Sequence, residues 1–175
     1  MQRPVSVNVF GILNIVFALF GVFGAIATVG LFSVTDASSN PVVRIMLENP
    51  NYAAWLKLTI PLGLVASALL LAAGIGLLLL KSWARKLSIA YAIFAILFGI
   101  LGTVVNYLYL VRPLLEEAQR SQGPEAAGAI GGAIGGIIGG CLGLVYPILL
   151  IIFMTRPKIV AAFQRPEPPP MPSTT

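Results

Sequence analysis

The sequence predicts an all-α integral membrane protein, and three observations support this prediction. Of 175 residues, 58% are hydrophobic and only 10% are charged, with a mean hydropathy of +0.94. Four apolar stretches contain no Asp, Glu, Lys or Arg, and each exceeds the roughly 20 residues that a helix needs to cross a bilayer. The basic residues gather on one side of these stretches. We therefore expect a four-helix bundle in a membrane, with both the N- and C-termini cytoplasmic.

The four predicted spans lie between the charged residues of the chain. A charge at the centre of a bilayer costs about 2.5 to 3.5 kcal/mol, so uncharged stretches of this length suit lipid better than water. The spans cover residues 5–34, 58–80, 87–111 and 126–154. They form one membrane domain, residues 1–155, followed by a Pro-rich cytoplasmic tail, residues 156–175.

The distribution of Lys and Arg predicts the orientation. One side of the membrane holds seven basic residues, which are Arg3, Lys81, Arg85, Lys86, Arg156, Lys158 and Arg165. The other side holds four, which are Arg44, Lys57, Arg112 and Arg120. Basic residues are enriched on the cytoplasmic side of membrane proteins. The turn between the second and third spans, with Lys81, Arg85 and Lys86, is the strongest part of this signal.

The first span has an alternative interpretation as a cleaved signal peptide, because Ala25-Ile26-Ala27 resembles a cleavage site. A signal peptide has an apolar region of about 7 to 15 residues. The apolar run here is much longer, and it continues past the site through Leu31 and Phe32. We therefore expect the first span to be retained.

The first connection on the outer side predicts a short surface helix. Asn40 can cap it and Pro41 can occupy its first turn, while Asn49-Pro50 should end it. Arg44 and Glu48 have the i,i+4 spacing of a surface ion pair. Such a helix could be a docking surface or a cover for the end of the bundle, and we favour the cover.

The second outer connection, from Arg112, predicts a helical extension that ends at Gly123-Pro124. Glu116 and Arg120 have the spacing of a surface pair. After the last span, the polyproline-like stretch from Pro166 could bind a partner or remain solvated, and we favour a solvated tail.

Glycine recurs regularly in the fourth span. The glycines are Gly128, Gly131, Gly132, Gly135, Gly136, Gly139, Gly140 and Gly143. In lipid the segment must still form a helix, because only a helix pairs all of its backbone groups within one segment. A strip of glycine then allows another helix backbone to approach closely. Three partners remain open: small residues of the other spans, such as Gly99 and Thr103, a second copy of the chain, or water in a pore.

The repeated Gly-x-x-x-Gly pattern from Gly128 to Gly143 resembles the glycine zipper of bacterial membrane proteins. The whole layout, with Arg3-Pro4-Val5 entering the first span and Tyr146-Pro147 in the last, resembles small uncharacterised bacterial four-span membrane proteins. The resemblance implies close helix packing and a place in the cell membrane, as a multi-pass protein of the bacterial inner membrane. It implies no particular activity.

The chemistry available to the chain is narrow. It has no His and one Cys, so the commonest acid/base group and metal ligand are absent. In the spans, Asn14 is the best candidate for an interhelical hydrogen bond, and Cys141 is expected to act as a small apolar residue. We expect no catalytic, metal, cofactor or nucleic-acid site. The sequence favours a non-enzymatic interaction or accessory subunit. A small homo-oligomeric channel or transporter is the alternative, and a membrane enzyme comes third.

Overall fold

The computed structural model describes residues 5–34, 41–120 and 124–163, and every regular element in these residues is helical. This confirms the predicted all-α class. Within these residues, four helices are long and apolar enough to cross a membrane. The long helices are α1 (Val5–Val34), α3 (Pro50–Leu78), α4 (Ser82–Asn106) and α6 (Pro124–Met154). The shorter elements are α2 (Pro41–Glu48), the π-helical turn η1 (Tyr107–Val111), α5 (Arg112–Arg120) and α7 (Pro157–Ala162).

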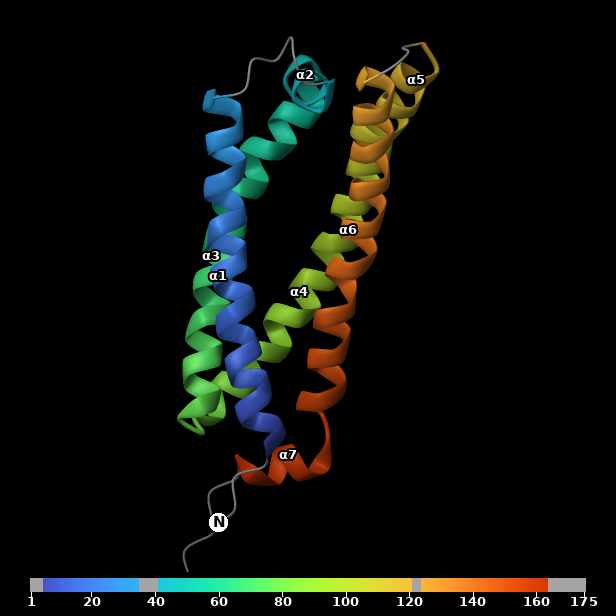
Figure 1. Cartoon of the computed structure of the whole chain (residues 1–175). Coiled ribbons are helices and arrows are strands. Elements are labelled where there is room, and N and C mark those ends of the chain that lie inside the picture. The colour runs from blue at the N-terminus through green and yellow to red at the C-terminus, as the bar shows by residue number, and fades with distance from the viewer. Residues whose placement is uncertain (1–4, 35–40, 121–123, 164–175) are drawn as a thin grey trace, which may run out of the picture.

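The long helices form two pairs (Figure 1). α1 packs along α3, and α4 packs along α6, while α4 also contacts α3 and so joins the two pairs. The start of α1 and the short helix α7 lie at one end of the molecule, and α2 and α5 lie at the other (Figure 1). We call these the α7 end and the α2/α5 end.

The second long helix begins earlier than the charge pattern predicts. α3 starts at Pro50 rather than at residue 58, so Lys57 lies inside the helix. α2 ends before Asn49, as expected. Asn49 is also the N-cap of α3, because its side-chain oxygen accepts hydrogen bonds from the backbone N–H groups of Asn51 and Tyr52 at 3.1 and 3.2 Å. Pro50 occupies the first turn, where its missing N–H is no loss.

The third long helix also extends beyond the predicted span. It runs without interruption from Ser82 through η1 to Arg120. Arg85 and Lys86 therefore lie in the first turns of α4, and the connection after α3 contains only Leu79, Leu80 and Lys81. Leu80 takes a left-handed backbone conformation, with φ of 52°, which reverses the chain in so few residues.

Two apolar clusters hold the ends of the molecule together. At the α2/α5 end the buried members are Tyr52, Leu110, Val111, Leu114, Ala129 and Ala133. At the α7 end they are Val7, Phe10, Leu77, Ala84, Ala92, Leu150, Met154, Ile159 and Phe163. Ile159 and Phe163 come from the segment after the last span, so the first part of the predicted tail is packed against the bundle. The Pro-rich stretch from residue 164 lies outside the described residues.

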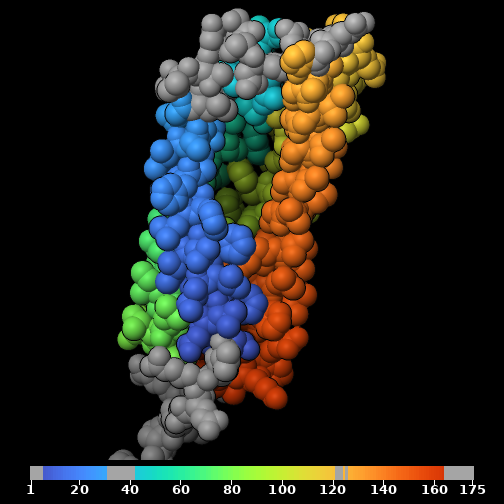
Figure 2. Space-filling view, viewed as in Figure 1, coloured from blue at the N-terminus to red at the C-terminus, as the bar shows by residue number. Residues whose placement is uncertain are grey.

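Among the described residues, the aromatic contacts between α1 and α6 lie towards the α7 end. The ring centroids of Phe10 and Phe153 are 4.7 Å apart and those of Phe17 and Tyr146 are 4.1 Å apart, with the rings tilted by 40° and 32°. Farther along, the two helices diverge, and the surface between them is hollowed, with α3 and α4 visible at its base (Figure 2). The bundle is therefore closed at the α7 end and open on this side towards the α2/α5 end.

Candidate functional site

The glycine-rich part of α6 carries two separate rows of glycine. The first, which we call the inner row, consists of Gly132, Gly136 and Gly140, and it faces the neighbouring helices. The second, the outer row, consists of Gly131, Gly135, Gly139 and Gly143. Because both rows repeat every four residues while a helix turns every 3.6, each row winds slowly around α6. From the sequence we expected these glycines to form one strip. In the structure the two rows have different surroundings, because the inner row contacts other helices and the outer row does not.

Each glycine of the inner row lies against another helix. A Cβ atom on Gly132 would lie 2.7 Å from Val42 Cγ2, and one on Gly140 would lie 3.1 Å from Thr103 Oγ1. Gly136 faces Val111, whose Cγ2 would be 3.3 Å from such an atom. Glycine therefore allows α6 to approach α2, α4 and η1 more closely than any side chain would permit.

The outer row faces away from the bundle. Apart from the adjacent residues and backbone of α6 itself, no atom of the described residues lies within 4 Å of the position that a Cβ would take on any of its four glycines. Gly128, the first glycine of the pattern, is also exposed. Large apolar side chains stand beside the row, with Ile134 and Ile138 each 52% exposed and Leu142 64% exposed. The outer row is a bare backbone strip beside a ridge of exposed apolar side chains.

A short polar chain of hydrogen bonds joins three helices in the part of the bundle nearer the α7 end. The Tyr146 hydroxyl of α6 donates to Asn14 Oδ1 of α1. Asn14 Nδ2 in turn donates to Ser88 Oγ of α4 at 3.2 Å, and the Ser88 hydroxyl donates to the carbonyl oxygen of Ala84 at 2.9 Å. The predicted interhelical role of Asn14 is therefore correct. These hydrogen bonds link α1, α4 and α6 and stabilise the packing of the three helices.

The basic residues of the turn between the second and third predicted spans, Lys81, Arg85 and Lys86, lie at the α7 end. Lys81 and Lys86 are exposed, whereas Arg85 is half-buried and its Nε donates to the carbonyl oxygen of Met154 at 3.0 Å. Met154 is the last residue of α6, where carbonyl groups lack a partner within the helix. Arg85 thus places a positive charge at the carboxyl end of α6, which the helix dipole favours.

The charged groups of the α2/α5 end pair differently from the prediction. Arg44 binds Glu117 at 2.7 Å across α2 and α5, rather than Glu48 within its own helix. Glu116 pairs with Arg112 at 3.2 Å, rather than with Arg120. α2 covers this end of the bundle, because Val43 is fully buried. The sequence therefore predicted the helices α2 and α5, but not the ion pairs that their charged residues form.

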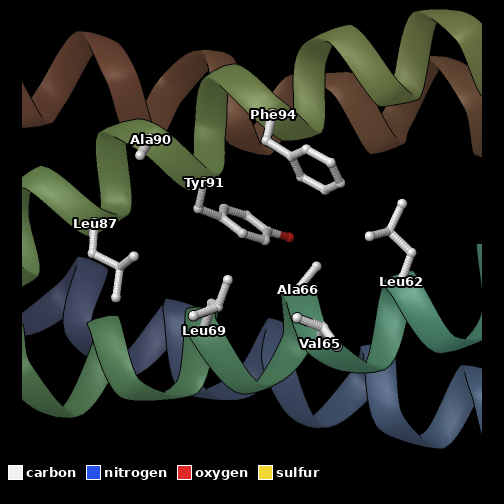
Figure 3. Close-up of a pocket in the computed structure, with 8 residues that line it drawn as sticks. All are labelled: Leu62, Val65, Ala66, Leu69, Leu87, Ala90, Tyr91 and Phe94. Atoms are coloured by element: carbon white, nitrogen blue, oxygen red, sulfur yellow. The ribbon is translucent and has the colours of Figure 1, made fainter.

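A shallow apolar pocket of about 200 Å³ lies between α3 and α4. Tyr91 reaches from α4 towards Ala66 of α3, and its hydroxyl lies within the pocket, beside Phe94 and Leu62 (Figure 3). The walls are otherwise aliphatic. Within the described residues, no three His, Cys, Asp or Glu side chains lie close enough to hold a metal ion. The pocket suits an apolar group rather than a polar substrate.

Sequence reasoning missed the glycines that join α1 and α3. Gly11 and Gly74 bring the two backbones together at the crossing of these helices. Gly11 stands alone among larger apolar residues, whereas Gly74 directly follows Ala72 and Ala73 and precedes Gly76 by two residues. The signal that could have identified them is the presence of a small residue in a predicted span, because small residues mark close helix contacts in membranes.

Comparisons with models of protein families, with curated proteins and with solved structures found no match to this chain.

Proposed function

We propose that the chain is a four-pass membrane protein that acts as a non-enzymatic interaction or accessory subunit, and that it binds a partner through the outer glycine row of α6. The partner is a transmembrane helix with small residues of its own, either from another membrane protein or from a second copy of the chain. In this proposal the α7 end faces the cytoplasm, in the bacterial inner membrane.

The bare outer row is the observation that supports this proposal. Lipid tails are as apolar as Leu, so helices in a membrane associate through close packing and hydrogen bonds rather than through the hydrophobic effect. Glycine weakens a helix relative to alanine by about 1 kcal/mol in water. The inner row uses its glycines for contacts within the molecule, whereas Gly135 and Gly139 face open space. A second helix packed against Gly135 and Gly139 would approach α6 as closely as the neighbouring helices approach the inner row.

The geometry of the outer row also suits a partner helix. Ile134, Ile138 and Leu142 form an exposed ridge next to it. A partner with small residues could place its backbone on the glycines and pack against this ridge. In many membrane helix pairs, glycines spaced by four residues serve this purpose.

Site-specific crosslinking in native membranes tests the proposal. Gly135→Ile and Gly139→Ile, combined in one variant, fill the outer row at two positions where a Cβ atom meets no described residue outside the adjacent stretch of α6. We expect the variant to keep the thermal stability of the wild type in detergent but to lose the crosslinked species. Leu97→Ile and Leu101→Ile, on the exposed face of α4, are the matched control and should keep it.

The result has three informative outcomes. Mass spectrometry of the lost species identifies either a second copy or a different protein as the partner. A crosslinked species that survives in the glycine variant contradicts the outer row as the contact. Ion conductance of the purified protein in liposomes, abolished by the same variant, would instead favour a homo-oligomeric channel.

A further inference from the structure

A groove lies at the α7 end, where the start of α1 meets the corner between α6 and α7 (Figure 1). Its volume is about 420 Å³, and its described lining consists of Ser6, Arg156, Pro157, Lys158 and Ile159. Arg156 and Lys158 are exposed, and Ser6 is half-buried. Unlike the apolar pocket between α3 and α4, this groove therefore presents charged and polar side chains to its surroundings.

The backbone that carries the two basic residues of the groove is held against the bundle. The Arg156 N–H group donates to the carbonyl oxygen of Phe153 at 3.2 Å, and the Arg156 guanidinium group lies over the Phe153 ring, 4.4 Å from its centroid. Directly after Lys158, Ile159 is only 3% exposed and belongs to the apolar cluster of the α7 end. Since the chain is anchored on both sides of Lys158, the two positive charges have a defined place beside α1.

No acidic side chain of the described residues balances these charges. Both printed ion pairs of the described helices lie at the α2/α5 end. Every Asp and Glu of the described helices belongs to α2, to α5 or to the first turn of α6, all at that same end (Figure 1). Lys81, Arg85 and Lys86 add further positive charge to the α7 end. The summed charge of this end therefore attracts a negatively charged ligand.

Apolar side chains near the groove indicate what kind of anion fits it. Val9, one turn after Ser6 on α1, is 45% exposed, and Ile152, four residues before Arg156 on α6, is 47% exposed. Both helices are apolar enough to span a membrane, and the groove lies at the point where they end. A ligand with acyl chains could thus contact these side chains while its headgroup reaches Arg156. Basic pockets between membrane helices bind anionic lipid headgroups.

We propose that this groove binds one phospholipid with a net negative charge, whose phosphate group lies between Arg156 and Lys158 and whose acyl chains lie along Val9 and Ile152. Arginine donates two parallel hydrogen bonds to a phosphate group, and the lysine ammonium attracts it as a point charge. A zwitterionic lipid fits less well, because it brings a cationic group to an end that is already positive. The proposal rests on the membrane placement in the proposed function, but not on the outer glycine row.

Photocrosslinking with two lipids of different charge tests the proposal. The purified full-length protein is placed in phosphatidylcholine nanodiscs with a low fraction of phosphatidylglycerol that carries a diazirine in one acyl chain, or of phosphatidylcholine with the same chain. Each basic residue near anionic lipid strengthens the attraction by about fivefold. For two residues we expect about five- to twenty-fivefold more labelling by phosphatidylglycerol in peptides around Val9 and Ile152, with a smaller ratio at high salt.

Two variants with the same change in charge distinguish a site from general attraction. Arg156→Gln with Lys158→Gln removes the charges of the groove and should bring the labelling ratio close to one. Lys81→Gln with Lys86→Gln removes two charges from the same end but outside the groove, and should keep most of the preference. Arg156→Lys with Lys158→Arg retains both charges and should keep it as well. Thermal unfolding in phosphatidylcholine nanodiscs checks that each variant is folded.

Three results would overturn the proposal. The first is equal labelling by the two lipids in the wild type. The second is an equal loss of preference in the two glutamine variants, which would leave only a general attraction of anionic lipid to the α7 end. The third is competition by an equal concentration of glycerophosphoglycerol, the same headgroup without acyl chains, because the groove would then bind a soluble phosphodiester. Labelling of α1 and α6 by phosphatidylcholine checks the membrane placement separately, and without it the proposed function would also fail.

Discussion

Gly74 of α3 lies against the backbone of Gly11 of α1, so that a Cβ atom on Gly74 would be only 2.8 Å from the carbonyl oxygen of Gly11. The contact is reciprocal, because a Cβ on Gly11 would be 3.3 Å from the carbonyl oxygen of Gly74. Carbonyl oxygens of a helix cannot move aside as the end of a flexible side chain can. The α1–α3 pair therefore depends on glycine at both positions.

Gly74→Val should separate α1 from α3. A branched side chain would overlap the Gly11 carbonyl and the Ile15 side chain, whose Cγ1 is 2.9 Å from the Cβ position. We expect a loss of about 1 to 3 kcal/mol in the free energy of unfolding, as for other overpacked cores. Reversible unfolding in mixed detergent micelles, followed by circular dichroism, measures it.

Gly139→Val is the matched control for this prediction. It introduces the same side chain at a position where a Cβ atom would have no described atom within 4 Å, apart from the adjacent stretch of α6. Its free energy of unfolding should stay within about 0.5 kcal/mol of the wild type, as is usual for exposed substitutions. If the two variants were destabilised equally, the Gly11–Gly74 contact would not be the cause of the loss.

The polar chain between Asn14 and Tyr146 should contribute a measurable coupling between α1 and α6. Tyr146→Phe removes the donor, and Asn14→Leu removes the acceptor together with the bond to Ser88. Hydrogen bonds between membrane helices average about 0.6 kcal/mol, with a maximum near 1.7. A double-mutant cycle of unfolding free energies should give a coupling in this range. A coupling of zero would mean that the hydroxyl and the amide do not interact in the folded protein.

The ion pair of Arg44 and Glu117 should contribute only weakly to the stability of the contact between α2 and α5. The two side chains are 35% and 29% exposed, so water and salt screen their attraction. We expect Arg44→Gln to lower the free energy of unfolding by about 0.2 to 1 kcal/mol, with a smaller effect at high salt. The exchange of both charges, Arg44→Glu with Glu117→Arg, should recover part of the loss. A larger loss in the exchanged variant than in the single one would contradict a direct pair.

The sequence predicted the helices because the signals for them are local. The absence of charge marked the four spans, and α1 begins and ends as expected, at Val5 and Val34. The predicted helix boundaries were wrong where a charged residue lies inside a helix. Lys57 was expected to mark the start of the second span, but α3 begins seven residues earlier, at Pro50. A charge limits the part of a helix that can lie in lipid, but it does not end the helix.

The contacts of the candidate site could not be predicted in the same way. The glycine pattern repeats along α6 without marking which glycines face inwards, because that depends on where α2, η1 and α4 lie in space. The partner of Arg44 is far away in the sequence, and so is that of Asn14.

The orientation should depend on the exposed lysines near the start of α4. Lys81→Ser with Lys86→Ser removes two positive charges from the α7 end and leaves the Arg85–Met154 hydrogen bond intact. Since excess Lys and Arg keep an end in the cytoplasm, we expect a fraction of this variant to insert in the opposite direction. Lys57→Ser with Arg120→Ser removes two charges from the other end and should strengthen the native orientation.

Cysteine labelling in intact cells measures this orientation. In a Cys141→Ala background, Gln119→Cys reports the α2/α5 end and Ala161→Cys reports the α7 end, and both positions are exposed. An impermeant maleimide should label only Gln119→Cys in the otherwise unchanged chain and both positions in the two-lysine variant. Labelling of Ala161→Cys in the otherwise unchanged chain would reverse the proposed orientation. If both double serine variants increased the inverted fraction, a loss of stability rather than the charge difference between the two ends would explain the change in orientation.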